Sequence, residues 1–144
     1  VKITHMHEFL EREIGKGAVA FKPMGTKLVF QDACRQSRFN GQAALPRKLL
    51  MQLCVADPQT LVDAAAPSVC CGNSAWTGCD AFSKSMQVQH IERAKQAGGQ
   101  TIVTACPKCQ IHLGCAMEDV MRGDELKMEM IDLTSAIAKS IYWA

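Results

Sequence analysis

Five of the eight cysteines in this chain stand in three short clusters, where metal binding or redox chemistry is possible. The clusters are Cys34, Cys70-Cys71 and Cys106-Pro-Lys-Cys109. The opening residues VKITHMHEFLERE have none of the features of a secretory signal, so we expect a reducing compartment. In such a compartment, clustered cysteines bind metals or catalyse redox reactions more often than they form structural disulfides.

The spacing within each cluster limits the kinds of metal site or redox reaction that its cysteines can support. Cys106 and Cys109 can clasp one metal ion or form a reversible disulfide at a helix start, where the helix dipole favours ionised thiols. Cys70 and Cys71 would point to opposite sides of an extended backbone, so separate irons of one cluster suit them better than a single zinc ion. Tetrahedral zinc and an ordinary cubane cluster each need four ligands. Five cysteines therefore indicate an unusual cluster with more than four thiolates, or a spare reactive thiol.

Strands and helices are expected to alternate along the chain. The pattern predicts helices that begin with Thr4 as N-cap and at Pro46, and that cover 84–97, 110–122 and 134–142. It predicts strands at 27–31, 61–62, 101–104 and 126–131. This alternation favours an α/β fold, a Rossmann-like layered domain with a mainly parallel sheet. Ligands collect outside the carboxyl ends of such strands, and the three cysteine clusters follow three strand ends, so we expect one site there.

Length and composition fit one domain. We expect residues 1–144 to form a single cysteine-rich unit, with an N-terminal helix and linker (1–25), a motif-bearing core (26–122), and a last strand and helix (123–144). The 48% apolar and 21% charged residues are typical of a folded globular protein. A net charge of +2 gives no indication of nucleic-acid binding, and no apolar stretch is long enough for membrane insertion. We expect a cytoplasmic protein, attached to a membrane complex only through partners.

Three cysteines lie outside the clusters. Cys54 and Cys115 fall on predicted helices, and we expect both to be buried in the core. Cys79 follows Cys71 by eight residues in a polar loop, which makes it the candidate for an extra metal ligand or a redox thiol.

The four histidines are weaker candidates. His5, His7 and His90 fall on polar helix surfaces, and we expect them to be exposed. His112 follows Cys109 by three residues, so it either approaches the cysteine site or is an exposed helical residue.

The three-part motif resembles the cysteine-rich CCG domain. That domain occurs in the B subunit of heterodisulfide reductase, in its membrane-bound counterpart, and in iron–sulfur subunits of glycolate and lactate oxidation systems. The resemblance extends from about Lys27 to Met117 and includes SKSMQVQHIERAKQAGG before TIVTACPKC. It implies a noncubane 4Fe-4S cluster, or zinc as the alternative, on Cys34, Cys70, Cys71, Cys106 and Cys109. Family members often carry two copies of the motif and often read His-Asp-Pro before the first cysteine, where this chain has one copy and reads Gln31-Asp32-Ala33.

The resemblance also implies a function, that of an oxidoreductase subunit similar to heterodisulfide reductase. A disulfide substrate would receive two successive electrons and leave as two thiols. The electrons would come from iron–sulfur or flavin subunits, because this sequence has no flavin or nicotinamide fingerprint and no ferredoxin-type cysteine run. Three alternatives stay open: an electron-relay module of a respiratory complex, a structural zinc domain, and a dithiol exchange enzyme that uses only Cys106 and Cys109.

Overall fold

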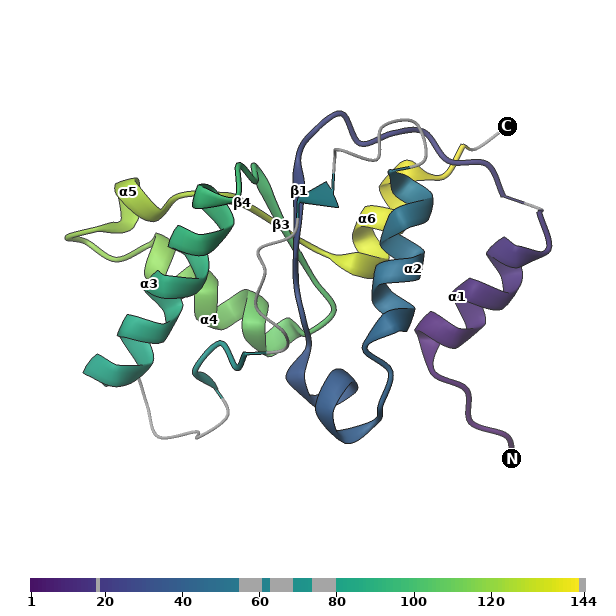
Figure 1. Ribbon diagram of the computed structural model, residues 1–144, viewed down its shortest axis with the longest axis horizontal. Coiled ribbons are helices and arrows are strands. Elements are labelled where there is room, and N and C mark those ends of the chain that lie inside the picture. Colours follow the sequence, from purple (N-terminus) through teal and green to yellow (C-terminus); the bar gives the residue numbers. More distant parts are fainter. Residues whose placement is uncertain (18, 55–60, 63–68, 74–79, 143–144) are drawn as a thin grey trace.

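A computed structural model of the chain describes residues 1–17, 19–54, 61–62, 69–73 and 80–142. Within this part, four strands form one sheet in which every strand pair is parallel (Figure 1). The strands are β1 (Leu28–Gln31), β2 (Leu61–Val62), β3 (Thr101–Thr104) and β4 (Glu129–Asp132), and their order is β2-β1-β3-β4. The predicted α/β fold with a parallel sheet is therefore confirmed. Because β1 and β3 are neighbours, the chain segments that follow them leave the sheet side by side.

Helices cover both faces of this sheet (Figure 1). On one side lie α1 (Met6–Gly15), α2 (Ala44–Leu53) and α6 (Leu133–Ser140), and on the other lie α3 (Ala81–Gln96), α4 (Pro107–Met117) and α5 (Gly123–Leu126). A π-helical turn, η1 (Arg35–Phe39), directly follows Cys34. None of the described helices is long and apolar enough to cross a bilayer.

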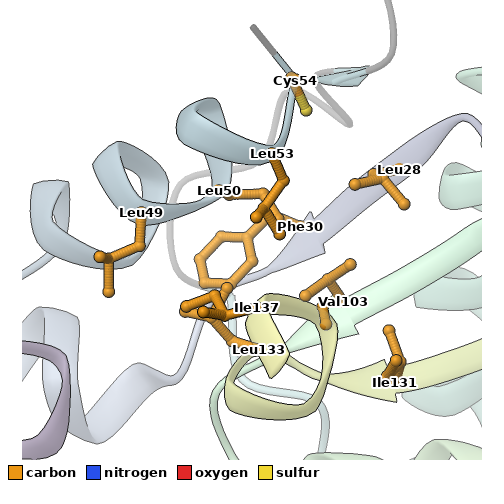
Figure 2. Packing of buried hydrophobic residues seen from close by; sticks show 11 residues of the cluster. Leu28, Phe30, Leu49, Leu50, Leu53, Cys54, Val103, Ile131, Leu133 and Ile137 are labelled. Carbon is orange, nitrogen blue, oxygen red and sulfur yellow. The ribbon is translucent and has the colours of Figure 1, made fainter. Parts of the chain in front are cut away.

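Alternation along the strands divides the core into two layers. Leu28 and Phe30 of β1 face α2 and α6, where they pack with Leu50 and Ile137 (Figure 2). Val29, between them in sequence, lies on the opposite face, whose core is built mainly by α3 and α4. The sheet is thus buried on both sides, as expected for parallel strands connected by helices.

Several predicted boundaries were wrong. His5, and not Thr4, caps α1: its Nδ1 accepts the backbone N–H of His7 (3.2 Å), and the Glu8 carboxylate accepts the N–H of His5 (3.2 Å). The helix predicted at 110–122 starts instead at Pro107, because a proline in the first turn needs no N–H partner. It ends at Met117, and the extra one-turn helix α5 delays β4 to Glu129.

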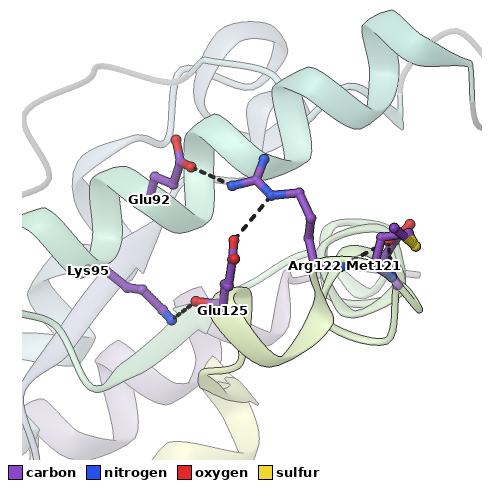
Figure 3. A network of polar contacts seen from close by, with 6 residues as sticks. Glu92, Lys95, Met121, Arg122 and Glu125 are labelled. Carbon is purple, nitrogen blue, oxygen red and sulfur yellow. Dashed lines mark hydrogen bonds and ion pairs between the residues drawn. The ribbon is translucent and has the colours of Figure 1, made fainter.

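A surface network positions α5 against α3 (Figure 3). The Arg122 guanidinium contacts the carboxylates of Glu92 (3.1 Å) and Glu125 (3.3 Å), and the Lys95 ammonium donates to the Glu125 backbone carbonyl. Exposed ion pairs contribute only about 0–1 kcal/mol each. The network therefore specifies where the short helix lies and adds little to the free energy of unfolding.

Candidate metal and redox site

The first and third cysteine clusters follow adjacent strands. Cys34 lies three residues beyond the end of β1, and Cys106 lies two residues beyond the end of β3. Cys106 is the N-cap of α4, which places Cys109 in the first turn of that helix. Because β1 and β3 are parallel neighbours, all three cysteines lie at the carboxyl edge of the sheet.

The second cluster is tied to the same edge by two side chains. Gln31, the last residue of β1, donates from its amide to the carbonyl of Val69 (3.4 Å). Asn73 donates from its amide to the carbonyl of Lys108 in α4 (3.1 Å). The segment 69–73 is thus held between the ends of β1 and β3 by contacts on either side of the cysteine pair.

Three hydrogen bonds join the five motif cysteines into two groups at this edge. The thiol of Cys34 is hydrogen-bonded to that of Cys70, while the thiols of Cys71 and Cys106 are both hydrogen-bonded to that of Cys109. The described residues hold no preformed group of three or more His, Cys, Asp or Glu side chains arranged around a single metal ion. Cys79 lies outside the described residues. We refer to Cys34, Cys70, Cys71, Cys106 and Cys109 as the thiol ring.

Two thiols of the ring carry lowered pKa values. The hydrogen bond from Cys109 and those from the backbone N–H groups of Lys108 and Cys109 lower the pKa of Cys106 to about 5. The Cys109 hydrogen bond and the Asn73 N–H likewise lower the pKa of Cys71 to about 7. Cys109 has a raised pKa because its proton is shared with both of these thiolates. In the metal-free ring, Cys109 therefore keeps its proton while Cys106 is ionised.

At Cys34, burial and the neighbouring thiols raise the pKa of the thiol and do not lower it. Desolvation first, and then the approach of Cys70, raise the pKa of the Cys34 thiol. Metal binding requires thiolates, so a bound cation would have to displace this proton.

Comparison with known proteins identifies the family to which this domain belongs. The profile of the CCG cysteine-rich domain matches residues 28–114, from the start of β1 into α4. The chain belongs to the CCG cysteine-rich domain family. The B subunit of fumarate reductase (CoM/CoB) from Methanothermobacter marburgensis is 24% identical over 135 residues, covering 92% of this chain and 27% of the relative. The chain thus spans about a quarter of that protein's length. No solved structure matches.

A partly buried ion pair anchors the strand end that precedes Cys34 in this CCG domain. Asp32 is buried, and its carboxylate accepts a hydrogen bond from the Arg47 guanidinium of α2 (2.9 Å). The same guanidinium lies 5.5 Å from the centre of the Phe30 ring, a distance suited to a cation–π contact. Because the Asp32–Arg47 pair is partly buried and hydrogen-bonded, Arg47 holds α2 against the residues that directly precede Cys34.

The N-terminal helix also reaches the turn after Cys34. His7, expected to be exposed, is buried, and its Nδ1 lies 3.0 Å from the amide nitrogen of Gln36 in η1. Burial lowers the pKa of His7, so the ring is neutral and Nδ1 accepts this hydrogen bond. The N-terminal helix, on which His7 was expected to face solvent, therefore supports the cysteine site. The sequence offered no signal for this contact, because the two residues are far apart and both are polar.

On the other side of the sheet, the prediction that His90 is exposed was wrong, whereas His112 follows the first of its two predicted alternatives and approaches the cysteine site. His90 and His112 are both partly buried and hydrogen-bonded to the cysteine pair at 70–71. A signal existed for His112, because Ser83 and Gln87 share the buried stripe of α3 with Ile91. Polar residues in such a stripe need a buried partner, and His112 supplies it.

Cys54 and Cys115, which lie outside the motif, differ in burial. Cys54 is buried in the α2 layer of the core, as predicted. Cys115 was expected to be buried but is exposed on α4. The buried residues of α4 include Cys109, Leu113 and Ala116, and Cys115 falls outside that stripe.

The lowered pKa of Cys106 gives a testable pH dependence. In the reduced, metal-free protein, alkylation of Cys106 by iodoacetamide should be half-maximal near pH 5 and nearly constant from pH 6.5 to 8, because only the thiolate reacts. An ordinary cysteine with a pKa of 9.0 would gain about tenfold per pH unit over that range. Peptide mass spectrometry measures the rate. Cys109→Ala removes the main hydrogen-bond donor and should move the midpoint upward, and an unchanged midpoint would contradict the assigned cause.

Proposed function

We propose that the CCG domain holds an iron–sulfur cluster on the thiol ring and serves as the redox domain of a larger oxidoreductase that reduces a disulfide. The observation that carries this proposal is the division of the adjacent cysteines. Cys70 contacts Cys34, whereas Cys71 contacts Cys109, so the pair serves two parts of the ring. One tetrahedral ion has a single centre for its ligands, whereas a cluster with several irons offers separate ones.

The donor set fits an iron–sulfur cluster in number as well. Five thiols exceed the four ligands of a structural zinc site by one. They also sit at the strand ends of a parallel sheet, where such folds bind their ligands. We propose the noncubane 4Fe-4S type on these five residues, and residues 1–144 as one CCG-type domain. Cys79 stays a proposed sixth thiol near the site.

The chain's own groups suit this role. Cys106 and Cys71, with lowered pKa values, supply thiolates at neutral pH, and the positive charge of Lys108 further stabilises the Cys106 thiolate. The backbone N–H groups of Gly72 and Asn73 are directed at the sulfurs of Cys70 and Cys71. When bound, an iron–sulfur cluster supplies one-electron transfer, and hydrogen bonds to its sulfurs raise its potential.

Access to the ring favours catalysis over a sealed electron relay. Cys71 and Cys109 are buried, but Cys34, Cys70 and Cys106 are all partly exposed. A disulfide must reach the site, take up two electrons and two protons, and leave as two thiols. The partly exposed side of the ring is where we expect it to approach. A relay needs no such access.

The electrons would come from partner subunits. The relative from M. marburgensis is named as the B subunit of a fumarate reductase (CoM/CoB). By this relationship, we propose that the CCG domain works within a complex whose iron–sulfur or flavin subunits donate the electrons. The similarity covers about a quarter of the relative, so its whole activity is not assigned to this domain.

Metal analysis tests the proposal. Protein purified without oxygen should contain about four iron and four acid-labile sulfide per chain. After oxidation, electron paramagnetic resonance should show a cluster signal. Adding a thiol should change that signal. One zinc and no sulfide would overturn the redox mechanism and favour the structural zinc domain instead.

A further inference from the structure

Each backbone carbonyl of the cysteine pair has a histidine side chain as its hydrogen-bonding partner. The Nε2 atom of His90, on α3, lies 3.0 Å from the carbonyl oxygen of Cys70. A carbonyl can only accept, so this nitrogen carries a proton. His112, on α4, is hydrogen-bonded to the backbone of Cys71, a contact that raises the imidazole pKa. A contact of that sign comes from an acceptor, so the ring donates and the Cys71 carbonyl accepts.

Gln87 determines which nitrogen of His112 carries the proton. The Gln87 side-chain nitrogen lies 2.9 Å from the backbone carbonyl of His112 and 2.9 Å from its Nδ1. The carbonyl accepts, so the amide presents its N–H groups, and Nδ1 must accept as well. The proton is therefore on Nε2, which lies 3.2 Å from the Ser83 hydroxyl and 3.1 Å from the place that a Cβ on Gly72 would occupy, next to the cysteine pair.

Because the peptides are trans, a histidine that holds a carbonyl also sets the direction of the N–H in the same peptide. The C=O and N–H of one trans peptide point in opposite directions, and none of the described peptides is cis. When His112 holds the Cys71 carbonyl, the N–H of Gly72 points the other way, and it lies 3.4 Å from the Cys70 sulfur. When His90 holds the Cys70 carbonyl, the N–H of Cys71 points the other way, to the side of the peptide remote from His90.

We propose that His90 and His112, the latter oriented by Gln87, are positioning residues that fix the two peptides of the cysteine pair and thereby aim the Gly72 N–H at the Cys70 sulfur. They touch the peptides and not the sulfurs, so they act through the backbone. Groups that orient metal ligands in this way commonly change metal affinity and potential. The effect on a bound cluster rests on the proposed function, whereas the orientation of the peptides does not.

Amide exchange in the metal-free, reduced 144-residue protein tests the orientation itself. His112→Leu should make the Gly72 amide exchange about tenfold faster, and His90→Leu, which releases the preceding peptide and with it Cys70, should speed exchange of the same amide. Glutamine can place a donor near the Nε2 position, so His112→Gln and His90→Gln should restore slow exchange. Gln89→Leu, an exposed substitution next to His90, is the control. The Ile102 and Val103 amides of β3 report whether each variant is folded.

The loaded protein gives a second, independent result. Losing an N–H···S hydrogen bond leaves more charge on the sulfur, so both leucine variants should lower the reduction potential while the glutamine variants keep it. Unchanged exchange of the Gly72 amide in both leucine variants would overturn this inference. A protein that binds no cluster would contradict the proposed function alone, because the exchange measurement needs no metal.

Discussion

Cys71→Ser is expected to reduce bound iron and sulfide from about four of each per chain to less than one. Cys71 is buried and hydrogen-bonded to Cys109, so no other side chain of the ring takes its place. A serine hydroxyl is a poor ligand for iron, because it stays protonated at neutral pH. Iron and sulfide assays on protein prepared without oxygen measure the loss.

Cys115→Ser is the matched control for this experiment. Cys115 lies on the same helix as Cys109 but is exposed and outside the motif. The same chemical change there should leave the iron and sulfide content at the wild-type value. Equal losses in Cys71→Ser and Cys115→Ser would mean that the assay reports general damage and not ligand removal.

The same substitution separates the cluster from a dithiol exchange enzyme. If Cys106 and Cys109 alone carried out thiol–disulfide exchange, then Cys34→Ser and Cys71→Ser would keep most of the activity. The proposed cluster predicts that both variants lose it. Cys34 is the sharper test, because it belongs to the end of the ring that contacts Cys70.

Gly72→Ala should lower the free energy of unfolding by about 2–6 kcal/mol, the sum of a backbone cost and a crowding cost. Gly72 has φ +102°, a conformation that costs a residue with a Cβ about 1–3 kcal/mol. An added Cβ would also lie 3.1 Å from Nε2 of His112 and 3.3 Å from the carbonyl oxygen of Ser83, and such crowding costs a further 1–3 kcal/mol or so. Denaturant unfolding of the metal-free, reduced protein measures the change.

Gly98→Ala separates the two costs. Gly98 also has positive φ, +82°, but no atom lies within 4 Å of the place that its Cβ would occupy, so only the backbone cost of about 1–3 kcal/mol is expected. Gly98 lies at the end of α3, away from the thiol ring, so iron content should be unchanged in this variant. Equal destabilisation by the two alanines would show that the contact with His112 does not crowd the site.

Much of the framework was predictable because it depends on local pattern. LVFQ and TIVT are apolar, β-branched runs followed directly by cysteines, and both form the expected strands. Once helices separate such strands, a parallel sheet follows, and its carboxyl ends gather whatever comes next. The convergence of Cys34 and Cys106 was therefore predictable from the sequence.

The local turns were harder to predict. The π-helix at Arg35–Phe39 and the short helix α5 have no simple periodicity, and propensity alone does not distinguish them from loops. The end of α4 was predicted five residues too late. Asp119 accepts the backbone N–H groups of Met121 and Arg122 (2.9 and 3.2 Å), a local turn that replaces a further helical turn.

By itself, the sequence determined the fold class, the family and the five residues of the thiol ring, because periodicity and motif spacing are local properties of the chain. Only the tertiary structure decided the surroundings of the ring. His7 is buried, and His90 and His112 are partly buried, because another element packs over each of them. Which imidazole nitrogen meets which carbonyl depends on how α3, α4 and the segment 69–73 pack together. Such contacts join residues far apart in the chain, and no local pattern encodes them.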